Sequence, residues 1–138
     1  MLVARQSKRL VPRLVGLRSF TSFEKDENGM VNINSKVAFD AIVASGKPIV
    51  ADFWAPWCGK CTQLSGFVEN LAEDHPNVTF VRLNTADEGV TPIKVALNVQ
   101  VLPTFRFFHD GKEVGSPVTG YKKDQLGHEV AKLDTLAE

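Results

Sequence analysis

Residues 53–61 read Phe-Trp-Ala-Pro-Trp-Cys-Gly-Lys-Cys and contain both cysteines of this 138-residue chain. The residues that lead into this segment, 48–54, are nearly all apolar, as expected of a strand that is covered on both faces. A helix is predicted after the second cysteine, because apolar residues recur there at helical spacing up to Pro76: Leu64, Val68, Leu71 and Ala72. The two cysteines therefore lie where a buried strand passes into a helix.

This position gives the two cysteines different roles. The first turn of a helix has unpaired backbone N–H groups and the positive end of the helix dipole, so we expect the thiolate of Cys58 to be stabilised. Cys61 follows one helical turn later, within disulfide reach and shielded from solvent. The spacing predicts that Cys58 attacks a disulfide in another molecule and that Cys61 resolves the mixed disulfide.

Two other roles for a Cys-x-x-Cys pair fit this chain less well. A zinc site needs two further ligands, yet the chain has no second cysteine pair, and no two of its three histidines are spaced as a His-x3–5-His pair. We expect no bound metal. A structural disulfide of this spacing closes a very small loop and adds little stability through loop entropy.

The rest of the chain alternates short apolar strands with helical segments. A first strand is indicated by Val31 and Ile33, and Ser35 is a candidate N-cap for a helix that ends at Gly46. The pattern then predicts strands over 78–83, 104–108 and 113–119, a short helix near 92–97, and a hairpin turn at 110–111. A last helix from residue 123 places apolar residues on one face: Leu126, Val130, Leu133 and Ala137. The order β-α-β-α-β-α-β-β-α predicts an α/β fold with a central mixed sheet and helices on both faces.

The segment Trp57-Cys-Gly-Lys-Cys61 resembles the active site of the thioredoxin family, and the resemblance extends over residues 35–133. Asp52 matches the buried aspartate of the family, and Leu102-Pro103-Thr104 matches the segment that holds its cis-proline. Trp54, Gly111 and Gly120 match further family positions. The resemblance implies a thioredoxin-like fold over 28–138 and a protein-disulfide reductase. It also implies electrons from NADPH through a separate thioredoxin reductase, no bound cofactor, clients such as peroxiredoxins, and a monomer.

The resemblance gives roles to the residues around the cysteines. Burial of Asp52 in an apolar strand should raise the pKa of its carboxyl group, so that Asp52 accepts the proton of Cys61. On the sequence alone, an Asp52 that faces water at a strand edge is the alternative. Pro103 is unwelcome in a central strand and implies a special turn there. The expected substrate groove binds mostly through backbone pairing and apolar contact, and it comprises Trp57, Gly59, Val101, Leu102, Pro103 and Gly120.

Four positions depart from the family pattern. Lys60 replaces the usual proline between the cysteines, and its ammonium group should favour the Cys58 thiolate and make the disulfide more oxidising. Gly66 stands where the family usually has a helix-kinking proline. Arg82 replaces a lysine near the buried aspartate and would hold Asp52 ionised if it reaches it. Val101 replaces a glycine and is expected to narrow the groove.

The N-terminal segment differs in charge from the rest of the chain. Residues 1–23 carry no acidic residue and five basic ones: Arg5, Lys8, Arg9, Arg13 and Arg18. This basic, amphipathic pattern is typical of a mitochondrial transit peptide, and we expect disorder and cleavage after Phe20. Pro12, which would interrupt a helix, is the main observation against it. A chloroplast address and a solvated basic tail on a cytoplasmic protein are the alternatives to the mitochondrial matrix.

The remaining residues carry 11 basic and 16 acidic side chains, a balance of −5, which argues against nucleic acid as a partner. The arginines of the N-terminal segment exclude a membrane span there.

Two alternatives to the reductase remain. The first is a protein disulfide oxidase or isomerase, which Lys60 favours. The second is a non-catalytic binding module that keeps the fold, which the intact cysteines, Asp52 and Pro103 disfavour.

Overall fold

The computed structural model describes residues 23–137. Except for Phe23, the predicted transit peptide and its processing site lie outside the described residues, as does Glu138.

The fold is built on a single five-stranded mixed sheet, as predicted. Its strands are β1 (Val31–Asn32), β2 (Ile49–Trp54), β3 (Thr79–Asn84), β4 (Thr104–His109) and β5 (Lys112–Thr119). They lie in the order β1-β3-β2-β4-β5, with β1 and β2 parallel to β3, and with β4 antiparallel to both β2 and β5. The antiparallel hairpin at the end of the chain therefore extends a parallel sheet built by the alternating part.

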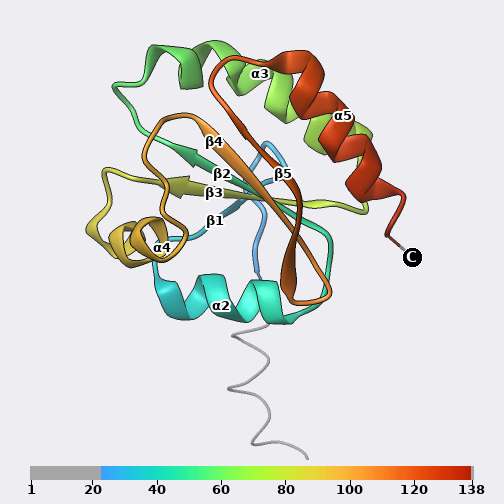
Figure 1. Ribbon diagram of the computed structural model, residues 1–138, viewed down its shortest axis with the longest axis horizontal. Helices are drawn as coiled ribbons and strands as arrows, with labels where there is room; N and C mark the ends of the chain where they lie inside the picture. Colours follow the sequence, from blue (N-terminus) through green and yellow to red (C-terminus); the bar gives the residue numbers. More distant parts are fainter. Residues whose placement is uncertain (1–22, 138) are drawn as a thin grey trace, which may run out of the picture.

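Helices cover both faces of this sheet, which is also as predicted. Helices α3 (Gly59–Asp74) and α5 (Lys123–Asp134) lie on one face, and α2 (Lys36–Ala44) and α4 (Thr91–Ala96) on the other (Figure 1). A hydrophobic core lies on each face of the sheet, and alternate residues of the central strand β2 point into one core or the other. Val50 packs with α3 and α5, whereas Ala51 and Phe53 pack with α2 and α4. The apolar run in β2 is explained by this burial on two faces.

Local sequence signals fix several element ends. The Ser35 side chain caps α2 by accepting a hydrogen bond from the Ala38 N–H at 3.2 Å. Asp110 and Gly111 both have positive φ angles, 56° and 82°, which gives the β4–β5 hairpin the two left-handed residues of a type I′ turn.

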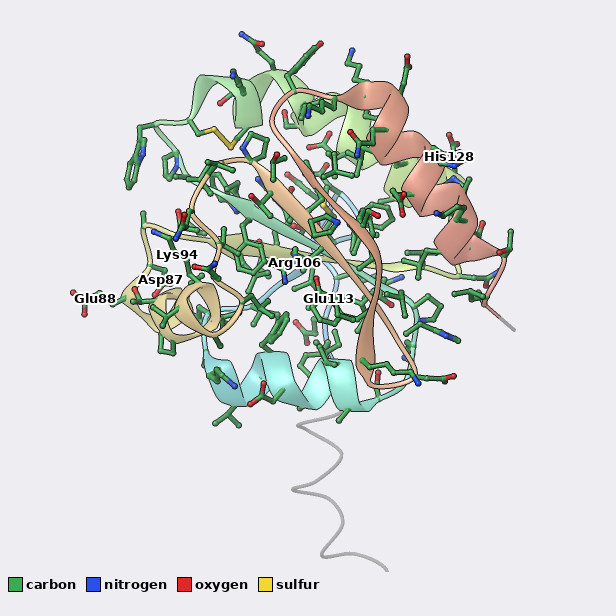
Figure 2. All side chains as sticks on the ribbon, viewed as in Figure 1. Asp87, Glu88, Lys94, Arg106, Glu113 and His128 are labelled. Atoms are coloured by element: carbon green, nitrogen blue, oxygen red, sulfur yellow. A yellow bond between two sulfur atoms is a disulfide. The ribbon has the colours of Figure 1, made fainter. Side chains whose placement is uncertain are left out.

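A contact network fixes the segment between α4 and β4. Arg106 in β4 donates from Nε and Nη2 to the carboxylate of Glu113 across the hairpin (Figure 2). Its Nη1 donates to the carbonyl oxygen of Leu97, just after α4, at 2.7 Å. The end of α4 is thereby tied to the sheet, and the loop that follows it has a fixed starting point.

Two sequence predictions about element ends are wrong, and one short element was not predicted. Helix α5 ends at Asp134, so Ala137 lies beyond it; the Thr135 side chain donates to the Lys132 carbonyl and helps to close the last turn. The first strand pairs only over Val31–Asn32, at the edge of the sheet. A 3-10 turn, η1 (Glu88–Val90), precedes α4 and had no counterpart in the apolar pattern. In the part of the chain that the structure describes, no helix is both long and apolar enough to cross a membrane.

Candidate active site

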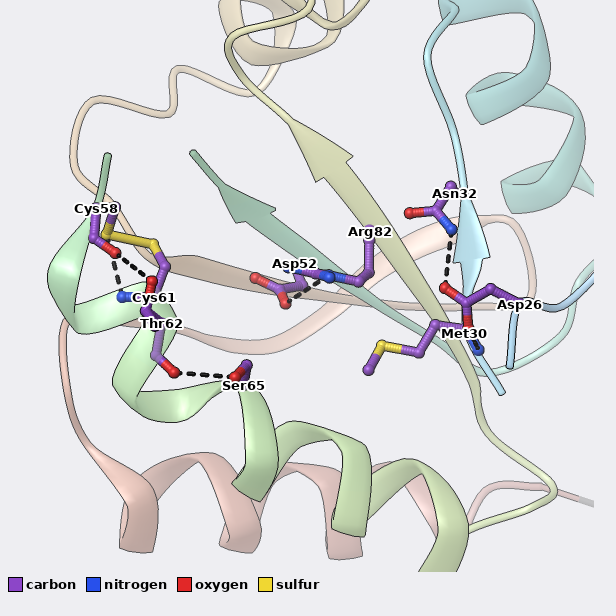
Figure 3. Close-up of polar contacts among 9 residues, drawn as sticks. All are labelled: Asp26, Met30, Asn32, Asp52, Cys58, Cys61, Thr62, Ser65 and Arg82. Carbon is purple, nitrogen blue, oxygen red and sulfur yellow. Dashed lines mark hydrogen bonds and ion pairs between the residues drawn. A yellow bond between two sulfur atoms is a disulfide. The ribbon is translucent and has the colours of Figure 1, made fainter. Parts of the chain in front are cut away.

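Cys58 and Cys61 form a disulfide at the start of α3, with their Cα atoms 5.3 Å apart. Cys58 is the N-cap residue of this helix, and its Sγ accepts a hydrogen bond from the Cys61 N–H at 3.1 Å (Figure 3). Its carbonyl oxygen accepts from the N–H and the hydroxyl of Thr62. The sulfur of Cys58 therefore sits at the positive end of a 16-residue helix, where a negative charge on it would be stabilised.

The two sulfur-bearing residues differ in their access to solvent. Cys61 is only 8% exposed, whereas Cys58 is half-buried. Beside Cys58, the Trp57 side chain is 73% exposed. An incoming molecule thus reaches Cys58 first, and Cys61 lies behind it on the inner side of the helix.

Asp52 lies inside the sheet, between the disulfide and Arg82 in the view of Figure 3. Asp52 is 6% exposed, and its side chain is on the same face of β2 as those of Val50 and Trp54. Burial raises the pKa of the Asp52 carboxyl group to about 7, although the Arg82 guanidinium acts to lower it. The alternative of a solvent-facing Asp52 at a strand edge is therefore wrong, because helix-covered β2 is the central strand.

Arg82 does reach Asp52 and acts to lower the pKa of its carboxyl group, but burial raises that pKa by more. The two residues are register partners on β3 and β2, with Arg82 Nε 3.7 Å from Asp52 Oδ2. A distance of 3.7 Å allows an ion pair without a hydrogen bond, and Nε has no hydrogen-bond partner among the described residues. The desolvation of the carboxylate therefore outweighs the attraction.

Arg82 also makes an aromatic contact that the sequence did not predict. Its guanidinium carbon lies 4.2 Å from the centroid of the Trp54 ring, within the range of a cation–π interaction. Trp54 and Arg82 stand on neighbouring strands and the same face of the sheet, so strand register would have been the signal.

Pro103 follows a cis peptide bond with Leu102, as the resemblance implied. Thr104 pairs with Phe53 in the sheet, which places Pro103 beside the end of β2 where the cysteine loop begins. The Pro103 carbonyl oxygen accepts a hydrogen bond from the Gly120 N–H at 2.9 Å, and Gly120 has a φ of 83° that favours glycine. The two segments, distant in sequence, are therefore joined next to the disulfide.

The remaining groove candidates lie around this junction. Val101 is 52% exposed, Leu102 packs partly into the core under α2 and α4, and Gly59 is the first residue of α3. Lys60 is exposed in the first turn of α3, and Gly66 is exposed farther along it. Gly111, in contrast, is at the tip of the β4–β5 hairpin, at the other end of β4 from Pro103. It serves the turn and not the site.

The described residues hold no group of three or more His, Cys, Asp or Glu side chains that could bind a metal ion. The cysteine pair is arranged for thiol–disulfide exchange: Cys58 is accessible at a helix N-terminus, whereas Cys61 is buried and is the nearer of the two to Asp52 in the view of Figure 3.

Comparison with known proteins agrees with this geometry. The family model described as Thioredoxin matches residues 30–132. Thioredoxin from Chlamydia pneumoniae is 41% identical over 97 residues, which covers 70% of this chain and 91% of that protein. Thioredoxin from Trypanosoma brucei brucei has a similar structure, with a TM-score of 0.73 and 26% identity over 80% of this chain and 95% of that one. Mitochondrial thioredoxin 3 from Saccharomyces cerevisiae shares the fold, with a TM-score of 0.70 at 23% identity over 75% and 94% of the two chains. The chain therefore belongs to the thioredoxin family, and with its Cys58–Cys61 pair it is a thiol–disulfide oxidoreductase.

Proposed function

We propose that this protein reduces disulfides in other proteins of the mitochondrial matrix. The proposal includes a separate thioredoxin reductase, which passes electrons from NADPH to the Cys58–Cys61 disulfide. The observation that carries the reductase assignment is the asymmetry of the pair. Cys58 is accessible at the N-terminus of α3, whereas Cys61 is buried and lies nearer to Asp52 in the view of Figure 3.

The proposed reaction proceeds in two exchange steps. The Cys58 thiolate attacks one sulfur of a client disulfide, and the other client sulfur leaves as a thiolate. Asp52 then accepts the proton of Cys61, whose thiolate attacks Cys58 Sγ and releases the second client sulfur. Two electrons pass to the client, which becomes a dithiol, and the protein returns to the disulfide seen in the structure.

Insulin reduction with dithiothreitol tests the reductase assignment. The wild type should accelerate precipitation of the insulin B chain, and Cys58→Ser should not, since the attacking thiolate is missing. Equal rates of insulin reduction by the wild type and by Cys58→Ser would contradict the reductase assignment and favour the non-catalytic binding module. Cys61→Ser lacks the resolving thiol, so it should not turn over and should accumulate mixed disulfides between Cys58 and insulin.

Asp52→Asn tests the proton acceptor in the second step. We expect attack by Cys58 to proceed at nearly the wild-type rate, and release of the mixed disulfide at pH 7 to slow by about 100-fold, the lower range for general base catalysis. Stopped-flow measurement with a chromogenic mixed disulfide separates the two steps. An unchanged release rate would exclude Asp52 from this role.

The oxidase or isomerase alternative has one observation in its favour. Lys60 is exposed one residue after Gly59 in the first turn of α3, where its positive charge favours the reduced Cys58 thiolate. A reduction potential close to that of protein disulfide isomerase, about −180 mV, would support it, and one near the −270 mV of thioredoxin would support the reductase.

The proposed mitochondrial location rests on the sequence of residues 1–23, which is basic and free of acidic residues, and the proposed clients rest on membership of the thioredoxin family. We propose that this segment directs import, that peroxiredoxins are among the clients, and that the protein works as a monomer. The full chain carrying Cys61→Ser, incubated with isolated mitochondria, should be imported and shortened. It should then form mixed disulfides that mass spectrometry identifies. A chain that stays outside and uncleaved would contradict the location.

A further inference from the structure

A strip of cationic and aromatic side chains leads away from the disulfide along α3. Lys60, Gln63 and Phe67 recur at positions i, i+3 and i+7, so they lie on one side of the helix. The loop between β5 and α5 runs past this helix in Figure 1 and adds Tyr121, and the first residue of α5 adds Lys123. We call these five residues, together with Lys122, the α3 strip.

Aromatic contacts join the two halves of the strip. The Lys123 Nζ lies 5.6 Å from the ring centroid of Phe67 on α3 and 5.6 Å from that of Tyr121. Tyr121 is itself 45% exposed and directly follows Gly120, whose N–H donates to the Pro103 carbonyl oxygen. The Lys123 ammonium group is thus held over two rings next to the groove, which lowers the conformational entropy that binding would cost.

The lysines of the strip are available to a partner. Lys60, Lys122 and Lys123 are all exposed, and none of them takes part in an ion pair among residues 23–137. Asp124 is the acidic neighbour of Lys123 and lies in the first turn of α5, where it complements the helix dipole. The strip itself therefore carries three positive charges, and Asp124 adds one negative charge beside it.

This local charge contrasts with the rest of the molecule. Residues 24–138 have five more acidic than basic side chains. On α3 itself, Glu69 and Glu73 line a cavity of about 480 Å³ together with Lys25 and Glu27. Glu69 is nine residues from Lys60, half a turn out of phase, so the acidic side of the helix faces away from the strip.

We infer that the α3 strip selects clients whose disulfide is flanked by acidic residues. This inference rests on the proposed reductase function and adds the charge of the client to it. From its N-cap Cys58 to Phe67, helix α3 is about 13 Å long at 1.5 Å per residue. An extended client segment covers that length with about four residues. Acidic side chains within four residues of the attacked cysteine would therefore meet the lysines.

The test uses three cyclic disulfide peptides that differ only in the two residues on each side of the disulfide. These residues are all glutamate in the acidic peptide, all glutamine in the neutral peptide and all lysine in the basic peptide. The protein is reduced beforehand and mixed with each peptide for a single turnover. The reaction is then stopped with acid and alkylated for mass spectrometry. We expect the acidic peptide to react roughly three- to tenfold faster than the neutral one at low salt, as exposed complementary charges allow. The ratio should approach one in 1 M NaCl, where the Debye length is about 3 Å.

A matched pair of double variants locates the effect. Lys122→Gln with Lys123→Gln should bring the acidic-to-neutral ratio of rate constants close to one. Lys47→Gln with Lys112→Gln makes the same charge change where β2 and β5 begin, at the opposite end of the sheet from the cysteines, and should keep the wild-type ratio. A wild-type ratio of one, or an equal loss in both double variants, would overturn the inference. If none of the three peptides is reduced, the proposed reductase function fails as well.

Discussion

At the scale of single residues, Asp52 places a carboxyl group where its charged form is poorly solvated. Its pKa is about 7 in the folded protein, against 3.8 for the unperturbed group. The folded state therefore holds the proton more tightly than the unfolded state, and the contribution of Asp52 to stability decreases as the pH rises from about 4 to about 7.

Asp52→Asn should remove this pH dependence. At pH 8 we expect the oxidised variant to unfold with a free energy up to about 4 kcal/mol higher than that of the wild type, since one pKa unit corresponds to about 1.4 kcal/mol. The difference should shrink as the pH falls toward 4. Urea unfolding at several pH values measures it, with the exposed Asp124→Asn as the control. A difference that does not change with pH would contradict the assignment of this pKa to Asp52.

Lys60 is the second residue with a consequence of its own. Lys60→Pro and Lys60→Met should both lower the reduction potential of the Cys58–Cys61 disulfide, because the reduced thiolate loses a neighbouring positive charge. A shift on the order of 10 mV is expected for an exposed pair. Redox titration against glutathione measures it, and Lys60→Arg, which keeps the charge, should leave the potential unchanged. An unchanged or higher potential in Lys60→Pro would exclude this effect.

At the scale of elements, α3 carries a glycine that packing does not require. A Cβ added at Gly66 would meet no atom within 4 Å, and the residue lies in the interior of the helix. Gly66→Ala should therefore raise the free energy of unfolding by about 0.5–1 kcal/mol, since alanine restricts the unfolded chain and favours helix. Urea unfolding is the measurement; a loss of stability would show that α3 needs the flexibility of glycine there.

The 3-10 turn η1, in contrast, contains a glycine that packing does require, Gly89. The Asp87 side chain caps it by accepting from the Gly89 N–H at 2.9 Å, and a Cβ at Gly89 would overlap the backbone carbonyl of Asn34. Gly89→Ala should lower the free energy of unfolding by about 1–3 kcal/mol, because backbone must shift to accept the methyl group. The same urea titration measures this loss, and a Gly89→Ala variant as stable as the wild type would show that the backbone shifts there without an energetic penalty.

At the scale of the whole molecule, α3 and α5 are tied together at their C-terminal ends. His75 Nδ1, at the C-cap of α3, lies 2.6 Å from Asp134 Oδ2, in the last residue of α5. Both side chains are partly exposed, so a double-mutant cycle with His75→Gln and Asp134→Asn should give a coupling energy of about 0.5–1 kcal/mol. Additive effects of the two substitutions on unfolding would show that the contact contributes nothing.

Local sequence determined much of this protein. The apolar run of β2, the caps and turns, and the spacing of the two cysteines are short-range signals, and they predicted the element order and the mixed sheet. The ends of α5 and β1 were predicted poorly because the apolar pattern does not record where hydrogen bonding stops. Ala137 continues the pattern after the helix has ended.

Tertiary structure alone decided the environment of Asp52. The sequence predicted that burial would raise its pKa and that Arg82 would oppose this, but the balance depends on a distance of 3.7 Å and on the contact of Arg82 with Trp54. The α3 strip also depends on tertiary structure alone. Phe67 and Lys123 are far apart in the sequence, and they meet because α5 packs beside α3 on one face of the sheet. Charges and rings act over a few ångströms, so only the packing of distant segments fixes what they do.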